Sequence, residues 1–227
     1  MRVHVAFTPA DAATAQLAIV VDVMRATSTI VQALASGYRR VLCCADIADA
    51  NALRAELGDT AITGGERDAQ RIEGFDAGAS PREFLEPRAE TLILSTTNGT
   101  RAIVTAAASC GEVVLGSLLN LDAVARLARE RAQDTVVICA GFKDDFAIDD
   151  AYCAGRIVAL LAAEHTDAAV AADVIAARYR EAIDGINART YGPPGLEDDI
   201  AWCSQVSVLG VVPRLSRMYG AAAEITL

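Results

Sequence analysis

The stretch that decides the fold is LAIVVDVMRATSTIVQALASG, residues 17–37 of the chain. Residues 17–23 are nearly all apolar, which predicts a β-strand that is buried on both faces. A helix is expected to follow at residues 27–35, and Gly37 then supplies the residue type that commonly ends a helix. A buried strand that leads directly into a helix is typical of an α/β sheet with parallel strands.

The same alternation continues along the chain with short connections. Further strands are predicted at residues 3–7, 41–44, 61–63, 91–95, 113–115 and 135–139. Helices are predicted at residues 46–57, from the turn at 97–100 to residue 108, at 120–131 and at 149–163. The remainder is predicted to be largely helical, with an interruption at 191–195 and a last strand at 224–227. This pattern predicts a mainly parallel sheet covered on both faces, and 227 residues fit one such domain or at most two small ones.

The composition narrows the class of protein. A net charge of −10 argues against nucleic-acid binding, which requires a basic face. No apolar run approaches the roughly 18 residues of a membrane-spanning helix, and the first residues break their apolar pattern too early for a signal peptide. We therefore expect a cytoplasmic protein with no membrane partner and with six reduced, mostly buried cysteines. With only two histidines, the metal ligands on offer are mainly carboxylates, which suit Mg²⁺ better than Zn²⁺.

Two loops carry hydroxyl residues and an arginine at the point where a strand passes into a helix. The first follows the strand at 17–23 and contains Asp22, Arg25, Thr27 and Ser28. Free amides at a helix N-terminus, hydroxyls and a guanidinium together make a receptor for phosphate. The alternative is that Thr27 or Ser28 only caps the helix, but a cap does not explain the neighbouring Arg25 and Asp22.

The second loop follows the strand at 91–95. Its polar and turn-forming residues are Thr97, Asn98, Gly99, Thr100 and Arg101. Asn-Gly is a turn signal in its own right, so a plain turn is the alternative. Ligands bind beyond the carboxyl ends of the strands in parallel sheets, which is where both loops fall. Two similar anion receptors suggest a substrate with two anionic groups.

Further carboxylates and the only lysine of the chain lie in other loops. Glu66 follows a predicted strand beside glycines that allow close backbone approach, and Asp76 lies among small residues. Lys143 precedes Asp149 and Asp150, which stand at a predicted helix start. Clustered carboxylates repel one another unless a cation balances them, so these acids are candidate metal ligands. The alternatives are a solvated loop for Asp76 and a helix cap for one of the pair Asp149 and Asp150.

Several phosphatase chemistries are excluded by spacing. None of the six cysteines has an arginine six positions further on, so the thiol–phosphate route lacks its signature. Asp22 has no second aspartate two positions on, as an aspartyl-phosphate route requires, and no Arg-His-Gly triplet is present for a phosphohistidine. The phosphate-binding P-loop and the dinucleotide fingerprint are missing as well. Hydrolysis with a carboxylate-held metal and arginine-lined anion pockets remains.

Five motifs, in order, resemble those of the 2-phosphosulfolactate phosphatase family. They are residues 20–30, 65–67, 74–81, 97–101 and 149–155, and weaker similarity continues through 199–205 to 212–213. The resemblance implies a three-layer α/β/α fold peculiar to the family, with residues 1–227 as one domain. It also implies a Mg²⁺-dependent enzyme that converts 2-phospho-3-sulfolactate to sulfolactate and phosphate, a step towards coenzyme M. Because the family also occurs where coenzyme M is not made, a related sulfonated or carboxylated phosphoester stays an alternative.

The motifs and the resemblance together give expectations for individual residues. Catalytic roles are expected for Asp22, Arg25, Glu66 and Lys143. Substrate binding is expected from Arg25, Thr27, Ser28, Thr97, Asn98, Gly99, Thr100 and Arg101. Mg²⁺ is expected on a subset of Asp22, Glu66, Asp76, Asp149 and Asp150.

Several alternatives stay open at this point. The attacking group is water or a serine or threonine side chain. A phosphotransferase or lyase that handles a small phosphorylated acid, or a non-catalytic small-anion-binding protein, would also account for the anion receptors. The apolar, alanine-rich carboxyl-terminal half is compatible with a homodimer.

Overall fold

A buried strand that passes directly into a helix stands at the centre of the structure. The computed structural model describes residues 1–11 and 14–227. The decisive stretch forms β2 (Leu17–Val21), which is buried along its whole length, and α1 (Ala26–Ala35). Gly37 follows the helix with a φ of +110°, the left-handed conformation that favours glycine. The predicted strand and helix are both confirmed.

The other elements follow the predicted alternation through most of the chain. The remaining strands are β1 (Arg2–Ala6), β3 (Arg40–Cys43), β4 (Ala61–Arg67), β5 (Gln70–Arg71), β6 (Thr91–Ser95), β7 (Glu112–Gly116), β8 (Thr135–Cys139), β9 (Glu164–His165), β10 (Arg214–Tyr219) and β11 (Ala222–Thr226). The remaining helices are α2 (Ile47–Leu57), α3 (Gly99–Ser109), α4 (Leu121–Arg131), α5 (Ile148–Val158), α6 (Asp167–Arg178), α7 (Ala182–Asn187) and α8 (Glu197–Cys203). Short 3-10 helices are η1 (Pro9–Asp11), η2 (Gly58–Thr60), η3 (Pro81–Phe84) and η4 (Leu118–Asn120).

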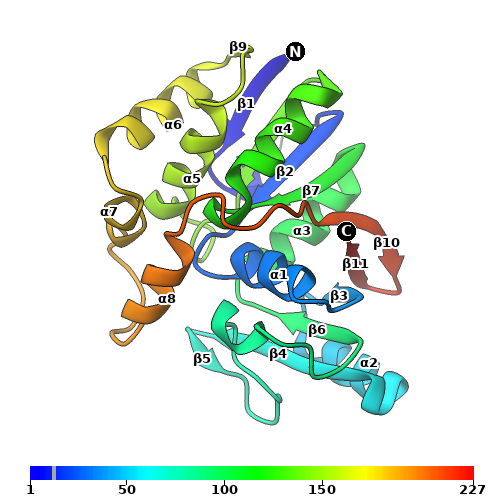
Figure 1. The fold of residues 1–227 in the computed structure, drawn as a ribbon. Coiled ribbons are helices and arrows are strands. Elements are labelled where there is room, and N and C mark those ends of the chain that lie inside the picture. Colours follow the sequence, from blue (N-terminus) through cyan, green and yellow to red (C-terminus); the bar gives the residue numbers. More distant parts are fainter. Residues whose placement is uncertain (12–13) are drawn as a thin grey trace.

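The strands form one mixed sheet in the order β5-β4-β6-β3-β11-β10-β7-β2-β8-β1-β9. It contains two parallel groups, β4-β6-β3 and β7-β2-β8-β1-β9. The antiparallel hairpin of β10 and β11 joins the two groups, and Figure 1 shows it at one side of the molecule, beside β3. The hairpin makes the sheet mixed, while every pairing inside the two main groups is parallel.

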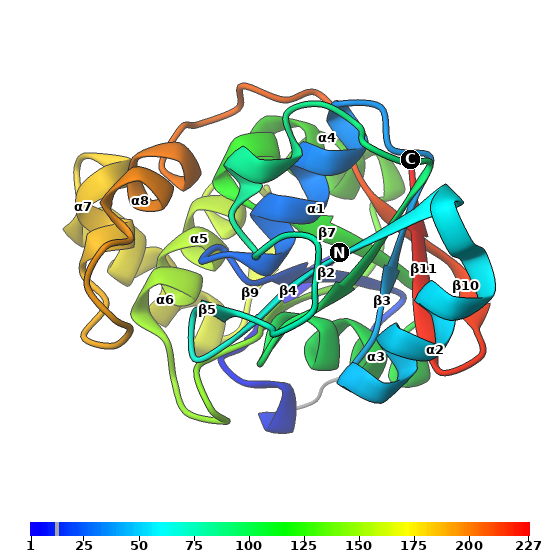
Figure 2. The ribbon, with the colours of Figure 1, turned by 90° about the horizontal axis from the view of Figure 1, so that it is seen from below.

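Helices cover the sheet on both faces. Ile19 of β2 faces a core that residues of α4, α5 and α6 complete, whereas its neighbour Val20 belongs to a core with residues of α1 and α3. A third, smaller core includes Ala50 of α2. Figure 2 shows α4 and α3 on opposite sides of the strands. The expectation of a three-layer α/β fold is therefore confirmed.

Three segments differ from the sequence prediction. Helix α5 ends at Val158 instead of residue 163, because the amides of Leu160 and Leu161 form short-turn hydrogen bonds and β9 then pairs with β1. The residues directly after β4, for which no strand was predicted, form β5, which pairs with the end of β4. Strand β10 was not predicted, because its residues are partly exposed and lack a regular apolar alternation.

The cysteines behave as expected for reduced thiols. Cys43, Cys44, Cys139, Cys153 and Cys203 are free and buried, whereas Cys110 is partly exposed. Among the described residues, no helix combines the length and the apolar character that crossing a bilayer requires.

Candidate active site

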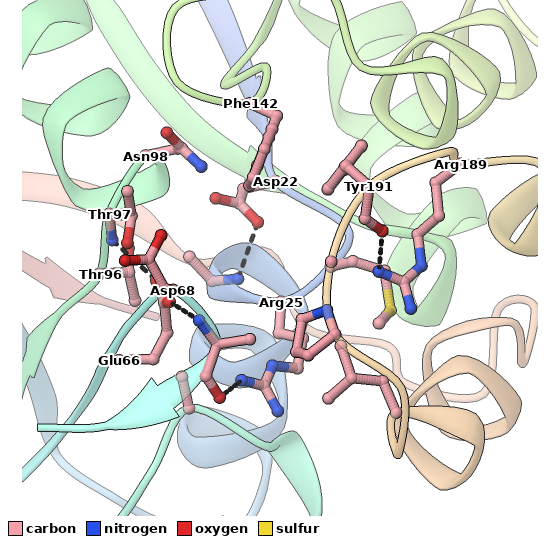
Figure 3. Close-up of a pocket in the computed structure, with 17 residues that line it drawn as sticks. Asp22, Arg25, Glu66, Asp68, Thr96, Thr97, Asn98, Phe142, Arg189 and Tyr191 are labelled. Carbon is pink, nitrogen blue, oxygen red and sulfur yellow. Dashed lines mark hydrogen bonds between the residues drawn. The ribbon is translucent and has the colours of Figure 1, made fainter.

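A cavity of about 310 Å³ lies where the loops after β2, β6 and β8 and the end of β4 meet the segment between α7 and α8. Figure 3 shows its polar side chains and the separate parts of the chain from which they come. The lining residues are Asp22, Met24, Arg25, Ala26, Glu66, Asp68, Ala69, Ala79, Thr96, Thr97, Asn98, Phe142, Arg189, Tyr191, Gly192, Pro193 and Leu196. A cavity of this size, at the carboxyl ends of parallel strands, suits a small-molecule ligand.

Asp22 is the first residue after β2 and is 7% exposed. Its Oδ1 atom accepts a hydrogen bond from the amide of Ala26 at 3.0 Å. Its Oδ2 atom lies so close to Gly99 that a Cβ at that position would stand 2.5 Å away. Burial, together with the negative charges of Glu66 and Asp149, raises the pKa of Asp22 to about 7. A cation beside this carboxylate would favour its charged form at neutral pH.

Glu66, near the end of β4, is fixed by two backbone amides. Its Oε1 atom accepts a hydrogen bond from the amide of Thr97 at 2.8 Å, and its Oε2 atom accepts one from the amide of Ala69 at 2.7 Å. The first bond ties β4 to the loop after β6, and the second holds the turn between β4 and β5. Glu66 therefore presents its carboxylate to the cavity in a defined orientation.

Asp149 and Asp150 lie near the start of α5 and are buried outside the cavity lining. Asp150 accepts hydrogen bonds from the amides of Val23 at 2.8 Å and Gly141 at 3.0 Å, so it connects the loops after β2 and β8. Asp149 accepts a hydrogen bond from the hydroxyl of Tyr191. Burial raises the pKa of both carboxyls, and at Asp150 the charge of Asp149 adds to the rise. Both acids hold together the segments that form the cavity.

Two arginines line the cavity and differ in their partners. Arg25 forms a buried ion pair with Asp199 of α8, with 2.5 Å between Nη1 and Oδ2, and also donates to the carbonyl of Ala69. Arg189 donates through Nη1 to the carbonyl of Tyr191, and within the described chain it forms no ion pair with a carboxylate. Arg25 is thus paired directly with a carboxylate, whereas Arg189 acts on the carboxylate of Asp149 only at longer range.

Some residues of the two predicted anion receptors lie behind the cavity wall. The hydroxyls of Thr27 and Ser28 donate to the carbonyls of Asp22 and Val23 in their own loop, and both residues are fully buried. Thr100 exchanges hydrogen bonds with Thr96 in the same way. Gly99 makes room for Asp22 and does not line the cavity. These four residues shape the loops and do not reach the cavity surface.

Three further candidates lie at the periphery. Arg101 faces Asp144 at 3.5 Å, and Lys143 contacts Asp68 at 2.7 Å in an exposed ion pair. Neither Arg101 nor Lys143 lines the cavity, although Asp68 does. Asp76 accepts hydrogen bonds from the amide and hydroxyl of Thr63 and is also outside the lining.

The structure thus brings together part of the predicted set and adds residues that were not predicted. Asp22, Arg25, Glu66, Thr97 and Asn98 all line the same cavity. The additional polar or aromatic lining residues are Asp68, Thr96, Phe142, Arg189 and Tyr191. The only sequence signal for the last two is the break in the helical pattern near residues 191–195, since loops on a rigid scaffold commonly carry function.

The donor set suits a magnesium ion that is shared with a substrate. Within the described parts of the chain, no three Asp, Glu, His or Cys side chains converge to hold a metal by themselves. Asp22 and Glu66 nevertheless both offer carboxylate oxygens to the cavity. Mg²⁺ commonly takes one or two protein carboxylates, and waters and substrate phosphate oxygens complete its coordination. Oxygen donors alone, one of them a carboxyl with a raised pKa, fit such a shared ion.

Comparison with known proteins points to one family. The sequence model of the family described as 2-phosphosulpholactate phosphatase matches residues 4–218. A probable 2-phosphosulfolactate phosphatase of Caldanaerobacter subterraneus subsp. tengcongensis is 36% identical over 209 residues, which cover 87% of this chain and 86% of that protein. The corresponding protein of Clostridium acetobutylicum is 37% identical, with coverages of 87% and 88%. A 2-phosphosulfolactate phosphatase of Methanothermobacter thermautotrophicus is 34% identical, with coverages of 94% and 92%.

Proposed function

Because this chain belongs to the 2-phosphosulfolactate phosphatase family, we propose that it hydrolyses 2-phospho-3-sulfolactate to sulfolactate and phosphate. The observation that carries this proposal is a small cavity in which Asp22 and Glu66 stand beside the loop of Thr97 and Asn98. Carboxylates for a metal and polar donors for phosphate oxygens are the groups that metal-assisted phosphate hydrolysis requires. The resemblance implies a step in coenzyme M formation, and we propose this role as well.

We propose Asp22 and Glu66 as the protein ligands of Mg²⁺. When bound, the ion would neutralise phosphate charge and activate a water molecule for attack on phosphorus. The two carboxylates are held by different segments, Asp22 by the amide of Ala26 and Glu66 by those of Thr97 and Ala69. Since each carboxylate is fixed by backbone donors, little ordering is left to be done when a ligand binds.

The loop after β6 supplies uncharged donors for phosphate oxygens. The Oγ1 atom of Thr97 is buried and has no hydrogen-bond partner in the protein. The Oδ1 atom of Asn98 accepts a hydrogen bond from the backbone amide of Lys143 at 3.0 Å. The Nδ2 group of Asn98 therefore remains available as a donor. Both residues line the cavity next to the start of α3, and the positive end of a helix dipole favours an anion. We propose that the phosphate lies at this end.

The assay that tests the function measures phosphate release from 2-phosphosulfolactate in the presence of Mg²⁺ or of a chelator. We expect release that depends on Mg²⁺ and that falls at least about 100-fold in Glu66→Gln, since electrostatic groups of this kind contribute a few kcal/mol to catalysis. Glu73→Gln is the matched control, because Glu73 is exposed and lies outside the cavity. Equal activity of Glu66→Gln and Glu73→Gln would remove Glu66 from the mechanism.

The same assay separates the other candidate functions. A phosphotransferase would move the phosphoryl group to an acceptor other than water, and a lyase would release phosphate together with an unsaturated acid. A non-catalytic anion-binding protein would bind sulfolactate without any turnover of phosphoesters. We expect free phosphate and sulfolactate in equal amounts, and any other product ratio would count against the hydrolase.

A further inference from the structure

Two buried polar atoms of the cavity wall have no partner in the protein. Within the described chain, the buried side-chain atoms that lack a hydrogen bond are Thr97 Oγ1, Arg189 Nε and Trp202 Nε1. The first two belong to residues that line the cavity, and they come from segments far apart in the sequence. An unpaired buried donor costs about 1–3 kcal/mol, so its position beside a cavity indicates a partner that arrives with a ligand.

The guanidinium of Arg189 is held in place by its own loop. Its Nη1 group donates to the carbonyl of Tyr191 at 2.9 Å, and it lies so close to Gly192 that a Cβ there would collide with Nη1. Gly192 also has a φ of +92°, which favours glycine. Tyr191 in turn donates to Asp149 and stacks on Phe142 with 4.2 Å between the ring centroids. A guanidinium fixed in this way keeps Nε free for a ligand at low entropic cost.

Charge is distributed unevenly across the cavity. Figure 3 shows Thr97 and Glu66 on one side, Arg189 on the other, and Asp22 between them. Arg25 is already paired with Asp199, so Arg189 carries the cavity's only positive charge without a carboxylate partner among the described residues. In the proposed function, Asp22 and Glu66 hold the metal that binds the phosphate. A second anionic group of the substrate therefore needs a different positive charge as its partner.

We propose that Arg189 is the specificity-determining residue that binds the non-reacting anionic end of the substrate, its sulfonate or its carboxylate. The phosphate then lies towards Thr97, Asp22 and Glu66, on the opposite side of the cavity. This inference rests on the proposed phosphatase function, and it assigns the orientation of the substrate within the site. Arg189 acts through binding and takes no part in breaking the phosphorus–oxygen bond.

The test compares substrates that carry or lack the acidic groups. The parent and Arg189→Gln are assayed with 2-phosphosulfolactate and with isopropyl phosphate, which has the same secondary phosphoester and no acid. We expect kcat/KM for the full substrate to fall about 10- to 100-fold in Arg189→Gln, mainly through KM, as for loss of a charge-assisted hydrogen bond. Turnover of isopropyl phosphate should change less than about 3-fold. An equal loss with both substrates would overturn the assignment.

Two half-substrates identify the group that Arg189 contacts. 2-Phospholactate lacks the sulfonate, and 1-sulfopropan-2-yl phosphate lacks the carboxylate. Whichever analogue keeps the penalty of Arg189→Gln carries the group that the guanidinium binds. Arg180→Gln is the matched control, because it removes the same charge from a side chain that is 96% exposed and lies outside the cavity lining, and it should behave as the parent.

Calorimetric binding of sulfolactate keeps this inference separate from the proposed function. If the parent releases no phosphate from any substrate, the phosphatase proposal fails on its own. In that case sulfolactate should still bind the parent at least about 10-fold more tightly than Arg189→Gln, as a charge-assisted contact predicts. Equal binding to both proteins, or no binding to either, would overturn the role of Arg189.

Discussion

The hydroxyl of Tyr191 is shared between the two carboxylate oxygens of Asp149, at 2.7 Å from Oδ1 and 2.8 Å from Oδ2. Asp149 is fully buried in α5, whereas Tyr191 lines the cavity from the segment between α7 and α8. This contact therefore ties the segment between α7 and α8 to the start of α5. It fixes Tyr191, and through the Tyr191 carbonyl it also fixes Arg189.

Removing that hydroxyl should weaken both the fold and substrate binding. Tyr191→Phe leaves a buried carboxylate without its side-chain donor, so we expect a loss of about 1–3 kcal/mol in the free energy of unfolding. Substrate KM should rise because Arg189 loses its support. Urea unfolding measures the first effect and steady-state kinetics the second. Tyr179→Phe is the control, since no hydrogen bond of the Tyr179 hydroxyl is found in the described chain, and a loss as large in that variant would contradict the explanation.

Close packing of Asp22 against Gly99 gives a second prediction. A Cβ in Gly99→Ala would stand 2.5 Å from Asp22 Oδ2 and would also collide with Ala26. Overpacking of this kind costs about 1–3 kcal/mol, and the displaced carboxylate should lower the affinity for Mg²⁺. Thermal unfolding and Mg²⁺ titration of the variant measure the two effects.

Gly210→Ala serves as the control for Gly99→Ala. A Cβ at Gly210 meets no atom within 4 Å, and its φ is not in the left-handed region. The same chemical change should therefore leave stability and Mg²⁺ affinity as in the parent. Wild-type Mg²⁺ affinity in Gly99→Ala would show that this packing does not position Asp22.

The part of the site that the sequence predicts is the part built from strand ends. Asp22, Glu66 and Thr97 each stand at or just after the end of an apolar strand, and parallel strands bring such ends together. Local patterns therefore sufficed for most strands of the sheet and for these lining residues. The same patterns do not show which way a hydroxyl points, and Thr27 and Ser28 turn theirs back onto their own loop.

The part that the sequence does not predict depends on packing between distant segments. Arg189 and Tyr191 reach the cavity because α7 packs beside α5 while α8 packs against α7 and η3, contacts that no short motif records. Strand β10 was missed for a related reason, since it joins the sheet through β11 and β7 although its side chains are partly exposed. Long-range contacts thus determine both the side of the cavity that Arg189 and Tyr191 form and the junction of the two groups of parallel strands.

The raised pKa of Asp22 predicts how stability depends on pH. An unfolded chain releases this proton near the ordinary value of 3.8, whereas the folded protein keeps it until about pH 7. Folding therefore retains a proton between these limits, so the stability of the metal-free protein should fall as pH rises from about 4 to 7. Asp149 and Asp150 change stability in the same direction, because burial raises their pKa too. Asp22→Asn should remove a pH-dependent loss on the order of 2–4 kcal/mol.

Mg²⁺ should counteract this loss where the carboxylates are ionised. Binding to Asp22 displaces its proton, so the rise in melting temperature on adding Mg²⁺ should be larger at pH 8 than at pH 6. Asp76→Asn is the control, because the amide of Thr63 lowers the pKa of that exposed carboxyl and its contribution is lost as pH falls. Asp76→Asn should keep the rise in melting temperature that Mg²⁺ causes, and Asp22→Asn should lose it. The reverse result would make Asp76, and not Asp22, the ligand of Mg²⁺.

The buried pair of Arg25 and Asp199 allows a structural role to be separated from a chemical one. Both side chains are less than 10% exposed, and within residues 1–11 and 14–227 Asp199 has only Ser80 as a further side-chain hydrogen-bond donor. Arg25→Ala should therefore cost about 3–5 kcal/mol, because it leaves an uncompensated buried charge. The double variant Arg25→Ala, Asp199→Ala should recover much of that stability. Arg82→Ala, which breaks the exposed pair with Asp198, should cost less than about 1 kcal/mol.

If Arg25 also contacts the phosphate, the double variant stays inactive although it is stable, whereas recovered activity would restrict Arg25 to holding α8 against the cavity.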